Sequence, residues 1–147
     1  MFQAFRQLLS RARNEFVVID TAPTGHTLLL LDVTGSFHRQ VIEGVGQQLR
    51  GVVTPLMRLQ DPDYSRVVIV TLAETTPVAE ATELQEDLRR AAIEPFGWVV
   101  NATLAGSGTD DPILGSRSAL ERIQLDRVAE NTKRMWSLPW SPSIAAG

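Results

Sequence analysis

The sequence predicts an α/β fold with a mostly parallel sheet in one domain spanning residues 1–147. Short apolar runs alternate with segments of helical periodicity, and the runs are FVVI (16–19), RVVIVTL (66–72) and GWVVN (97–101). Continuous apolar runs are typical of strands covered on both faces in a parallel sheet. The segment between the second and third runs is long enough for the helical crossover that joins parallel strands. A chain of 147 residues can bury one stable core.

Two helices are expected before the second run. Residues 2–13 show apolar residues at helical spacing with arginines toward the end. A second helical face comprises Phe37, Val41, Val45, Leu49 and Leu56. Three glycines interrupt this face, and each lowers helix propensity by about 1 kcal/mol. We therefore expect one bent helix or two short ones.

Two further helices have clear start signals. Thr76 followed by Pro77 predicts an N-cap and first turn, with a buried stripe at Val78, Ala81, Leu84 and Leu88. Asp111 followed by Pro112 predicts another start, and this helix carries Ile113, Leu120, Ile123 and Val128. The segment RMWSLPW (134–140) is consistent with a last short strand, and the remaining tail is expected to be loose.

Composition excludes several classes of function. The formal net charge of -3 and pI near 5.4 give no basic footprint for nucleic acid. With no cysteine, the segment has no disulfide framework, thiolate zinc site or thiol nucleophile. No stretch approaches the roughly 20 apolar residues of a membrane span, and the first residues do not fit a secretory signal. A cytoplasmic location is the expectation.

Polar residues gather where the expected strands end. Ligands in open α/β sheets bind outside the carboxyl ends of the strands, where Asp20, Thr71, Asn101 and the loop TAPTGHT are expected. An aspartate there suits Mg²⁺, which prefers hard oxygen ligands and keeps several waters. Asp20 could equally form a structural Asx turn. Asp20 could also be the phosphoacceptor of a receiver domain, with Thr71 as the hydroxyl residue that follows. Receiver domains need a lysine at the end of the third strand, where this chain has Asn101.

The string DTAPTGHT (20–27) resembles the switch II signature of the arsenical-pump, or anion-transporting, ATPase family, which is related to ATPases that deliver tail-anchored proteins. The similarity continues from VIVTLAETTP through GWVVN. It implies a partial P-loop NTPase-like, three-layer fold that uses ATP and Mg²⁺. By resemblance, Asp20 is catalytic and supports the magnesium through a water. Thr24 and Gly25 sense the γ-phosphate, Asn101 contacts the adenine, and Pro139 lies beside the base.

The family's phosphate-binding loop, Gly-Lys-Gly-Gly-Val-Gly-Lys-Thr, has no counterpart in these residues, and Lys133 is the single lysine. That loop supplies much of the charge neutralisation in phosphoryl transfer. We therefore expect the C-terminal, switch II and adenine-side part of an ATPase, incomplete without a P-loop half. The alternatives are a non-catalytic module that binds a nucleotide or partner, and a truncated fragment without independent function.

The expected partners are a P-loop-containing half or a full-length homologue in a dimer or pseudodimer, because the missing strands would leave a sheet edge exposed. A membrane transporter or a client protein is a further expected partner. The output, anion or metalloid export or protein targeting, is left open. Without cysteine, neither metalloid sensing nor a Cys-x-x-Cys zinc bridge can reside in this segment. The three tryptophans are expected to pack in the core or at its rim.

Overall fold

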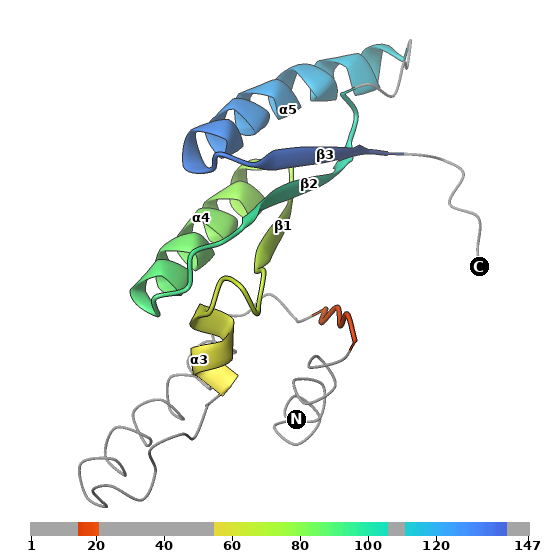
Figure 1. Ribbon diagram of the computed structural model, residues 1–147. Helices are drawn as coiled ribbons and strands as arrows, with labels where there is room; N and C mark the ends of the chain where they lie inside the picture. Colours follow the sequence, from red (N-terminus) through yellow and green to blue (C-terminus); the bar gives the residue numbers. More distant parts are fainter. Residues whose placement is uncertain (1–14, 21–54, 106–110, 141–147) are drawn as a thin grey trace, which may run out of the picture. The chain divides into compact units, whose positions relative to one another are not determined.

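The computed structural model describes residues 15–20, 55–105 and 111–140. They belong to two compact units, Met1–Ser65 and Arg66–Gly147, which we describe separately. The elements are α3 (Pro55–Gln60), β1 (Val68–Leu72), α4 (Thr75–Arg90), β2 (Gly97–Thr103), α5 (Pro112–Asn131) and β3 (Met135–Pro139) (Figure 1).

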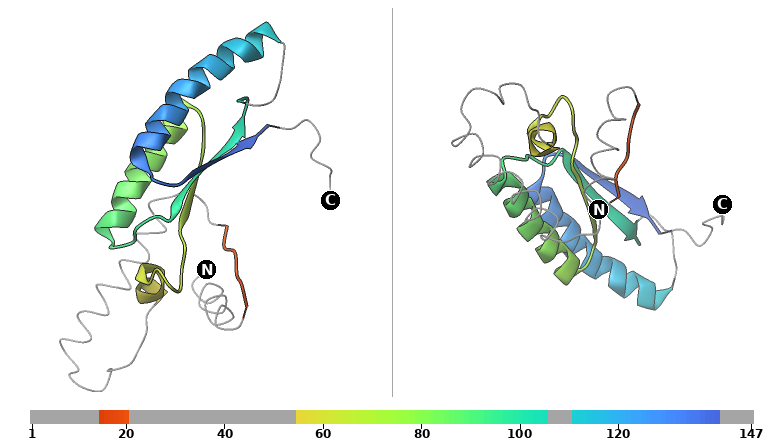
Figure 2. Two further views of the ribbon diagram at one scale, coloured as in Figure 1. Left: turned by 45° about the horizontal axis from the view of Figure 1, so that its top comes forward. Right: turned by 90° about the horizontal axis from the view of Figure 1, so that it is seen from below.

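The second unit is a three-stranded sheet in the order β1-β2-β3, and both strand pairs are parallel. α4 joins β1 to β2, and α5 joins β2 to β3. Crossovers between parallel strands are right-handed in almost all proteins, so two successive crossovers in the same direction place both helices on one face. α4 and α5 indeed lie side by side on the same face of the sheet (Figure 2). The α/β class and the parallel sheet, as in a partial P-loop NTPase-like fold, are confirmed.

The core lies between the sheet and the two helices. Its fully buried centre is Trp98 on β2, whose indole Nε1 donates a hydrogen bond to Oε1 of Gln85 at 2.8 Å. Nε2 of Gln85, on α4, donates in turn to the carbonyl oxygen of Asn131 at the end of α5, at 3.1 Å. Buried indole N–H groups usually have a partner, so this relay connects the sheet to both helices.

Two of the three expected strands are confirmed with shifted ends. The run at 66–72 forms β1, which begins at Val68, and the run at 97–101 forms β2, which continues to Thr103. The last strand, expected within 134–140, is β3. Trp98 is a core residue, whereas Trp136 and Trp140 are about half exposed at the rim.

The start of α4 differs from the expectation. The helix begins at Thr75, and Glu74 takes the N-cap position with extended backbone and no side-chain cap. The N–H of Val78 donates to the carbonyl oxygen of Glu74 at 3.0 Å. Pro77 therefore lies in the first turn, where no backbone N–H has an intrahelical partner, and its position does not define the exact start. Val78, Ala81 and Leu88 are buried as expected, and Leu84 is half-buried.

The start of α5 is confirmed. Oδ1 of Asp111 accepts hydrogen bonds from the N–H groups of Ile113 and Leu114, at 2.8 and 3.2 Å, and Pro112 is the first helical residue. The apolar stripe is not buried, because Ile113 is 79% exposed and Leu120 and Ile123 are also exposed. The buried side of α5 is instead formed by Val128 with two polar residues, Glu121 and Gln124.

In the first unit, residues 15–20 do not form the expected strand. They carry no strand pairing, and Phe16 is 94% exposed. A strand needs a neighbour for its backbone groups, and none of the described residues pairs with this run. α3 includes Leu56 of the second expected helical face. The helix expected at 2–13, the rest of the 37–56 face and the tail 141–147 lie outside the described residues.

Gly97 is required by a close contact. A Cβ at this position would lie 2.7 Å from the carbonyl oxygen of Arg134 and 2.7 Å from Cζ3 of Trp136. We expect Gly97→Ala to destabilise the chain by about 1–3 kcal/mol, because a backbone carbonyl cannot easily move aside. The matched control is Gly115→Ala within α5, where nothing lies within 4 Å; this change should stabilise the chain by up to about 1 kcal/mol. Urea unfolding tests both, and equal midpoints for the two variants would refute the prediction.

The Arg89–Glu94 ion pair predicts a specific pH dependence. Nε and Nη2 of Arg89 donate to the two oxygens of Glu94, at 3.0 and 2.9 Å, and these bonds lower the pKa of Glu94. Since the folded-state pKa is lowered, the stabilisation is present above the ordinary glutamate pKa and lost as pH falls through the folded-state pKa. Both side chains are largely exposed, so the contribution is below about 1 kcal/mol.

Glu94→Gln should therefore reduce the free energy of unfolding near neutral pH, and wild type and variant should converge in acid. Urea titrations across the pH range measure this difference. Glu83→Gln changes an exposed residue of α4 that forms no ion pair within the described residues, so it is the control and should show no such convergence.

Candidate functional site

The carboxyl edge of the sheet brings two of the sequence-predicted residues together. Asn101 is paired with Leu72 across β1 and β2, and Thr103 is paired with Pro139 across β2 and β3. The N–H of Trp140 donates to the carbonyl oxygen of Thr103 at 2.8 Å, which extends this link past the end of β3. Asn101 and Pro139 therefore lie on neighbouring strands at the same edge.

Thr71 lies at the carboxyl end of β1, where it is paired with Val100. It is buried on the helix-covered side of β1, with its hydroxyl donating to the carbonyl oxygen of Leu72 at 3.2 Å. Side chains alternate between the two faces of a strand, and Thr71 shares the inward face with Ile69. Thr71 therefore lies near the expected edge, but its side chain faces the core and not the exposed side that carries Asn101.

Asn101 occupies an irregular end of β2. The pairing with β3 shifts register between Val100 and Thr103, and Ala102 has a φ of 52°. Oδ1 of Asn101 accepts the N–H of Ala102 at 2.9 Å, so the side-chain carbonyl stabilises this turn of the backbone. The side chain is exposed, and within the described residues its Nδ2 makes no hydrogen bond. Asn101 thus offers two N–H donors to an acceptor at the edge.

Glu121 fixes the backbone just beyond Asn101, and the sequence gives no signal for this role. The side chain is 4% exposed, and its Oε2 accepts the N–H of Leu104 at 2.7 Å. The two residues are far apart in sequence and meet only because α5 packs against β2. On the other side, Thr103 donates its hydroxyl to the carbonyl oxygen of Leu138 at 3.4 Å. The end of β2 is therefore held by both α5 and β3.

Polar contacts also connect the helices near their N-terminal ends. Nη2 of Arg117 on α5 lies 2.7 Å from Oε1 of Glu74, which precedes α4. Nε2 of Gln124 donates to Oγ1 of Thr75 at 3.3 Å. These bonds position the two helices beside the strand ends that carry Asn101.

The magnesium-side residues are only partly described. Asp20 is exposed and lies in the first unit, whereas Thr24 and Gly25 lie outside the described residues. No group of three or more potential ligands among His, Cys, Asp and Glu occurs in the described residues. A single carboxylate nonetheless fits Mg²⁺ that is held mainly by phosphates and waters.

None of the described helices is long and apolar enough to cross a membrane.

The buried Glu121 contact can be tested directly. Glu121→Leu should leave the Leu104 N–H without an acceptor and destabilise the chain by about 1–3 kcal/mol. The Leu104 amide should also exchange faster with solvent, as measured by NMR. Glu121→Gln keeps an acceptor and should lose less, and Glu130→Leu on the exposed side of α5 is the control. Unchanged exchange at Leu104 in Glu121→Leu would contradict the assigned contact.

Comparison with known proteins shows similarity to arsenical pump-driving ATPases along the chain. Residues 1–58 match the family model described as anion-transporting ATPase. An arsenical pump-driving ATPase of Acidiphilium multivorum is 47% identical over 148 residues, covering 100% of this chain and 25% of the relative. An arsenical pump-driving ATPase of Escherichia coli is 49% identical over 128 residues, covering 87% of this chain and 22% of the relative.

A more distant relative is the ATPase GET3 of Lodderomyces elongisporus, which is 26% identical over 145 residues and covers 78% of this chain and 41% of the relative. The chain spans about a quarter of the length of the arsenical pump-driving ATPases that it matches. The chain therefore resembles part of the arsenical pump-driving ATPases, and its first 58 residues match the anion-transporting ATPase family.

Proposed function

We propose that this chain supplies the switch II and adenine-side portion of an ATPase that couples ATP hydrolysis to anion or metalloid export or to protein targeting. The observation that carries the proposal is the meeting of Asn101 and Pro139 at one strand edge, in a chain 47% identical to an arsenical pump-driving ATPase. Both residues were expected beside the adenine from the family resemblance alone. The Nδ2 donors of Asn101 suit the ring nitrogens of a base.

The proposed roles divide between the two units. Asp20 holds Mg²⁺ through a water, and Thr24 and Gly25 respond to the γ-phosphate. Asn101 and Pro139 bind the base. When bound, Mg²⁺ neutralises developing charge on the phosphates. The chain's own contribution is to orient the base and to place the Asp20 carboxylate near the ion.

The proposed enzyme needs a second part. These residues hold no glycine-rich loop with lysine, so a P-loop half or a full-length homologue is the proposed partner in a dimer or pseudodimer. Within the described residues β1 pairs only with β2, so its other edge has unpaired backbone groups, as an adjoining strand would require. We further propose a cytoplasmic location, with a membrane transporter or a client protein as the recipient of the ATPase cycle.

The second candidate is a non-catalytic module that binds a nucleotide or a partner without turnover. The lack of a phosphate-binding lysine loop in these residues favours it. A truncated fragment without independent function is the remaining alternative. All three differ in what happens when a P-loop half is supplied.

The test is complementation. The full 147-residue chain is mixed with a recombinant P-loop half taken from an arsenical pump-driving relative, and phosphate release is measured. We expect ATPase activity in the mixture only. Asp20→Asn should lower kcat by about 100-fold or more, since it removes a charge that acts at the metal. Asn101→Ala should raise KM for ATP by about tenfold, equivalent to one hydrogen bond, with little change in kcat.

The enzyme hypothesis would be rejected if the two halves formed a complex without turnover and the Asp20→Asn variant bound ATP as the wild type does. That result would favour the non-catalytic module. Absence of both a complex and nucleotide binding would indicate a fragment without independent function. Glu83→Gln on α4 serves as the variant that should leave all readings unchanged.

A further inference from the structure

β2 contains one extra residue where it reaches the carboxyl edge of the sheet. Val100 is paired with Ser137 and Thr103 with Pro139, so three steps along β2 correspond to two steps along β3. This irregularity is a β-bulge, which often occurs beside functional sites and redirects side chains. Thr103 is fully buried although it lies an odd number of residues from the buried Val100. The bulge therefore redirects the residues between them, one of which is Asn101.

The backbone of this bulge has an unfavourable conformation. Ala102 has a φ of 52°, in the left-handed region that glycine adopts readily and residues with a Cβ rarely adopt. Such a conformation persists only where the surrounding structure enforces it. Oδ1 of Asn101 accepts the N–H of Ala102 at 2.9 Å, but this hydrogen bond is local and exposed. The bulge therefore needs further support from buried contacts.

That support comes from the backbone immediately after the bulge. The N–H of Leu104 donates to Oε2 of Glu121 at 2.7 Å, and the carbonyl oxygen of Thr103 accepts the N–H of Trp140 at 2.8 Å. Glu121 is 4% exposed and, within the described residues, forms no ion pair. A buried carboxyl group with one backbone partner is a poor source of stability compared with an apolar side chain. Its position at the end of the bulge favours a role in holding the backbone.

We propose that Glu121 is a positioning residue of the base-binding edge, which holds the Leu104 N–H and thereby keeps Ala102 in the conformation in which Asn101 presents its Nδ2 donors. The inference rests on the proposed function, because it concerns the same edge. Pairing of Val100 with β3 fixes the start of the bulge, and Glu121 fixes its end. The two residues between these points are thereby restricted to one backbone conformation.

This restriction would raise the affinity for a nucleotide without adding a contact to it. A side chain that is already held in its binding orientation loses less conformational freedom when a ligand binds. Without Glu121, Ala102 would return to a negative φ, and its hydrogen bond to Oδ1 of Asn101 would be lost. The ligand would then have to order this segment. The expected result is weaker nucleotide binding in addition to lower stability.

The test compares two substitutions of Glu121. ATP with Mg²⁺ is titrated into the full 147-residue chain, and binding is followed by the NMR signals of the Asn101 side-chain amide. We expect Glu121→Leu to weaken binding by about tenfold, comparable to the loss of one hydrogen bond. Glu121→Gln keeps a side-chain oxygen as acceptor and should bind ATP nearly as tightly as the wild type.

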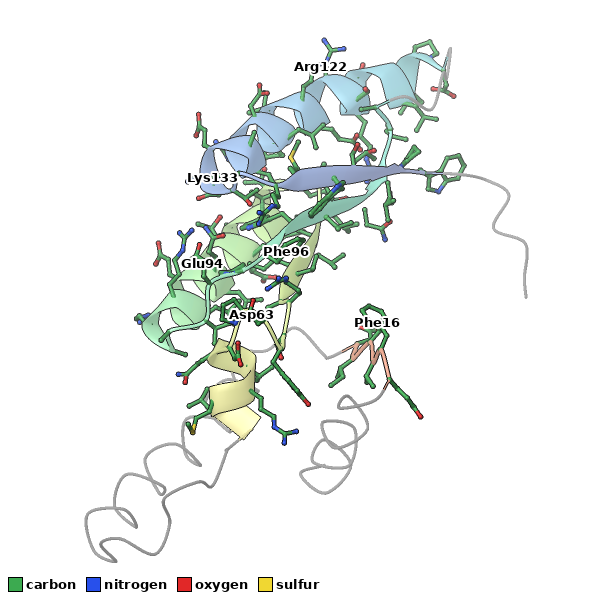
Figure 3. The ribbon with its side chains drawn as sticks, in the orientation of Figure 1. Phe16, Asp63, Glu94, Phe96, Arg122 and Lys133 are labelled. Carbon is green, nitrogen blue, oxygen red and sulfur yellow. The ribbon has the colours of Figure 1, made fainter. Side chains whose placement is uncertain are left out.

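Two controls on α5 separate positioning from stability. Val128→Ala truncates a fully buried side chain, so it should destabilise the chain but leave ATP binding unchanged at temperatures where the variant is folded. Arg122 follows Glu121 in the sequence, but its side chain lies on the outer surface of α5 (Figure 3), so Arg122→Leu should change neither property. An equal loss of ATP affinity in Val128→Ala and Glu121→Leu would overturn the proposal.

Substitutions of Ala102 test the backbone directly. Glycine adopts the left-handed conformation readily, so Ala102→Gly should restore much of the affinity that Glu121→Leu loses. Ala102→Val introduces a β-branched side chain and should weaken ATP binding even when Glu121 is present. A positive φ gives a strong NOE between the N–H and Hα of one residue. This NOE at Ala102, measured without nucleotide, should weaken in Glu121→Leu and stay strong in Val128→Ala.

The outcomes distinguish this proposal from the proposed function. An unchanged NOE at Ala102 in Glu121→Leu, or no recovery of affinity with Ala102→Gly, would overturn the positioning role. Absence of ATP-dependent shifts at Asn101 in the wild type would overturn it together with the assignment of the base to this edge. Shifts that depend on Glu121, without ATPase activity in the complementation experiment, would reject the enzyme and still support the positioning role.

Discussion

The second unit depends on the rule that parallel strands are joined only by crossovers. β2 pairs in parallel with both neighbours, so α4 and α5 must each return from the carboxyl end of the sheet to its amino end. Because the strand order follows the chain order, both helices cover the same face. This arrangement accounts for the buried core and for the opposite face that has no helix. It also collects the strand ends that carry Asn101 and Pro139 at one edge.

Buried polar contacts then fix how the helices sit on the sheet. Gln85 accepts from Trp98 and donates to Asn131, so one side chain connects α4, β2 and α5. Glu121 connects α5 to the end of β2 by accepting the N–H of Leu104. Each buried group would cost free energy if unpaired, so these contacts favour one packing of the helices over others. The edge that carries Asn101 is thereby held by the core.

Local chemistry was enough to predict β1, β2 and the start of α5. Asp111 and Pro112 act within a single turn. The apolar runs of β1 and β2 indicate strands whatever the rest of the chain does. The exact start of α4 was not predictable, because Pro77 is tolerated at several first-turn positions. The inward orientation of Thr71 was not predictable, because the run RVVIVTL is apolar on both faces and does not reveal which residues point inward.

Other features depend on distant parts of the chain. The role of Glu121 arises only after α5 packs against β2, so no short pattern encodes it. The run at 16–19 has the composition of a strand, but composition cannot supply a neighbouring strand. The same reasoning applies to the exposed side of β1. Val68, Val70 and Leu72 are as apolar as strand residues that are covered on both sides.

The two ends of the sheet make different demands on a partner. At the carboxyl end the described residues offer hydrogen-bond donors on Asn101, which suit a small polar ligand. At the amino end Arg66 and Arg134 lie over the ring of Phe96, which stacks on the half-exposed Trp136. The proposed base-binding edge at Asn101 and the apolar surface around Val70 therefore involve different residues of the second unit.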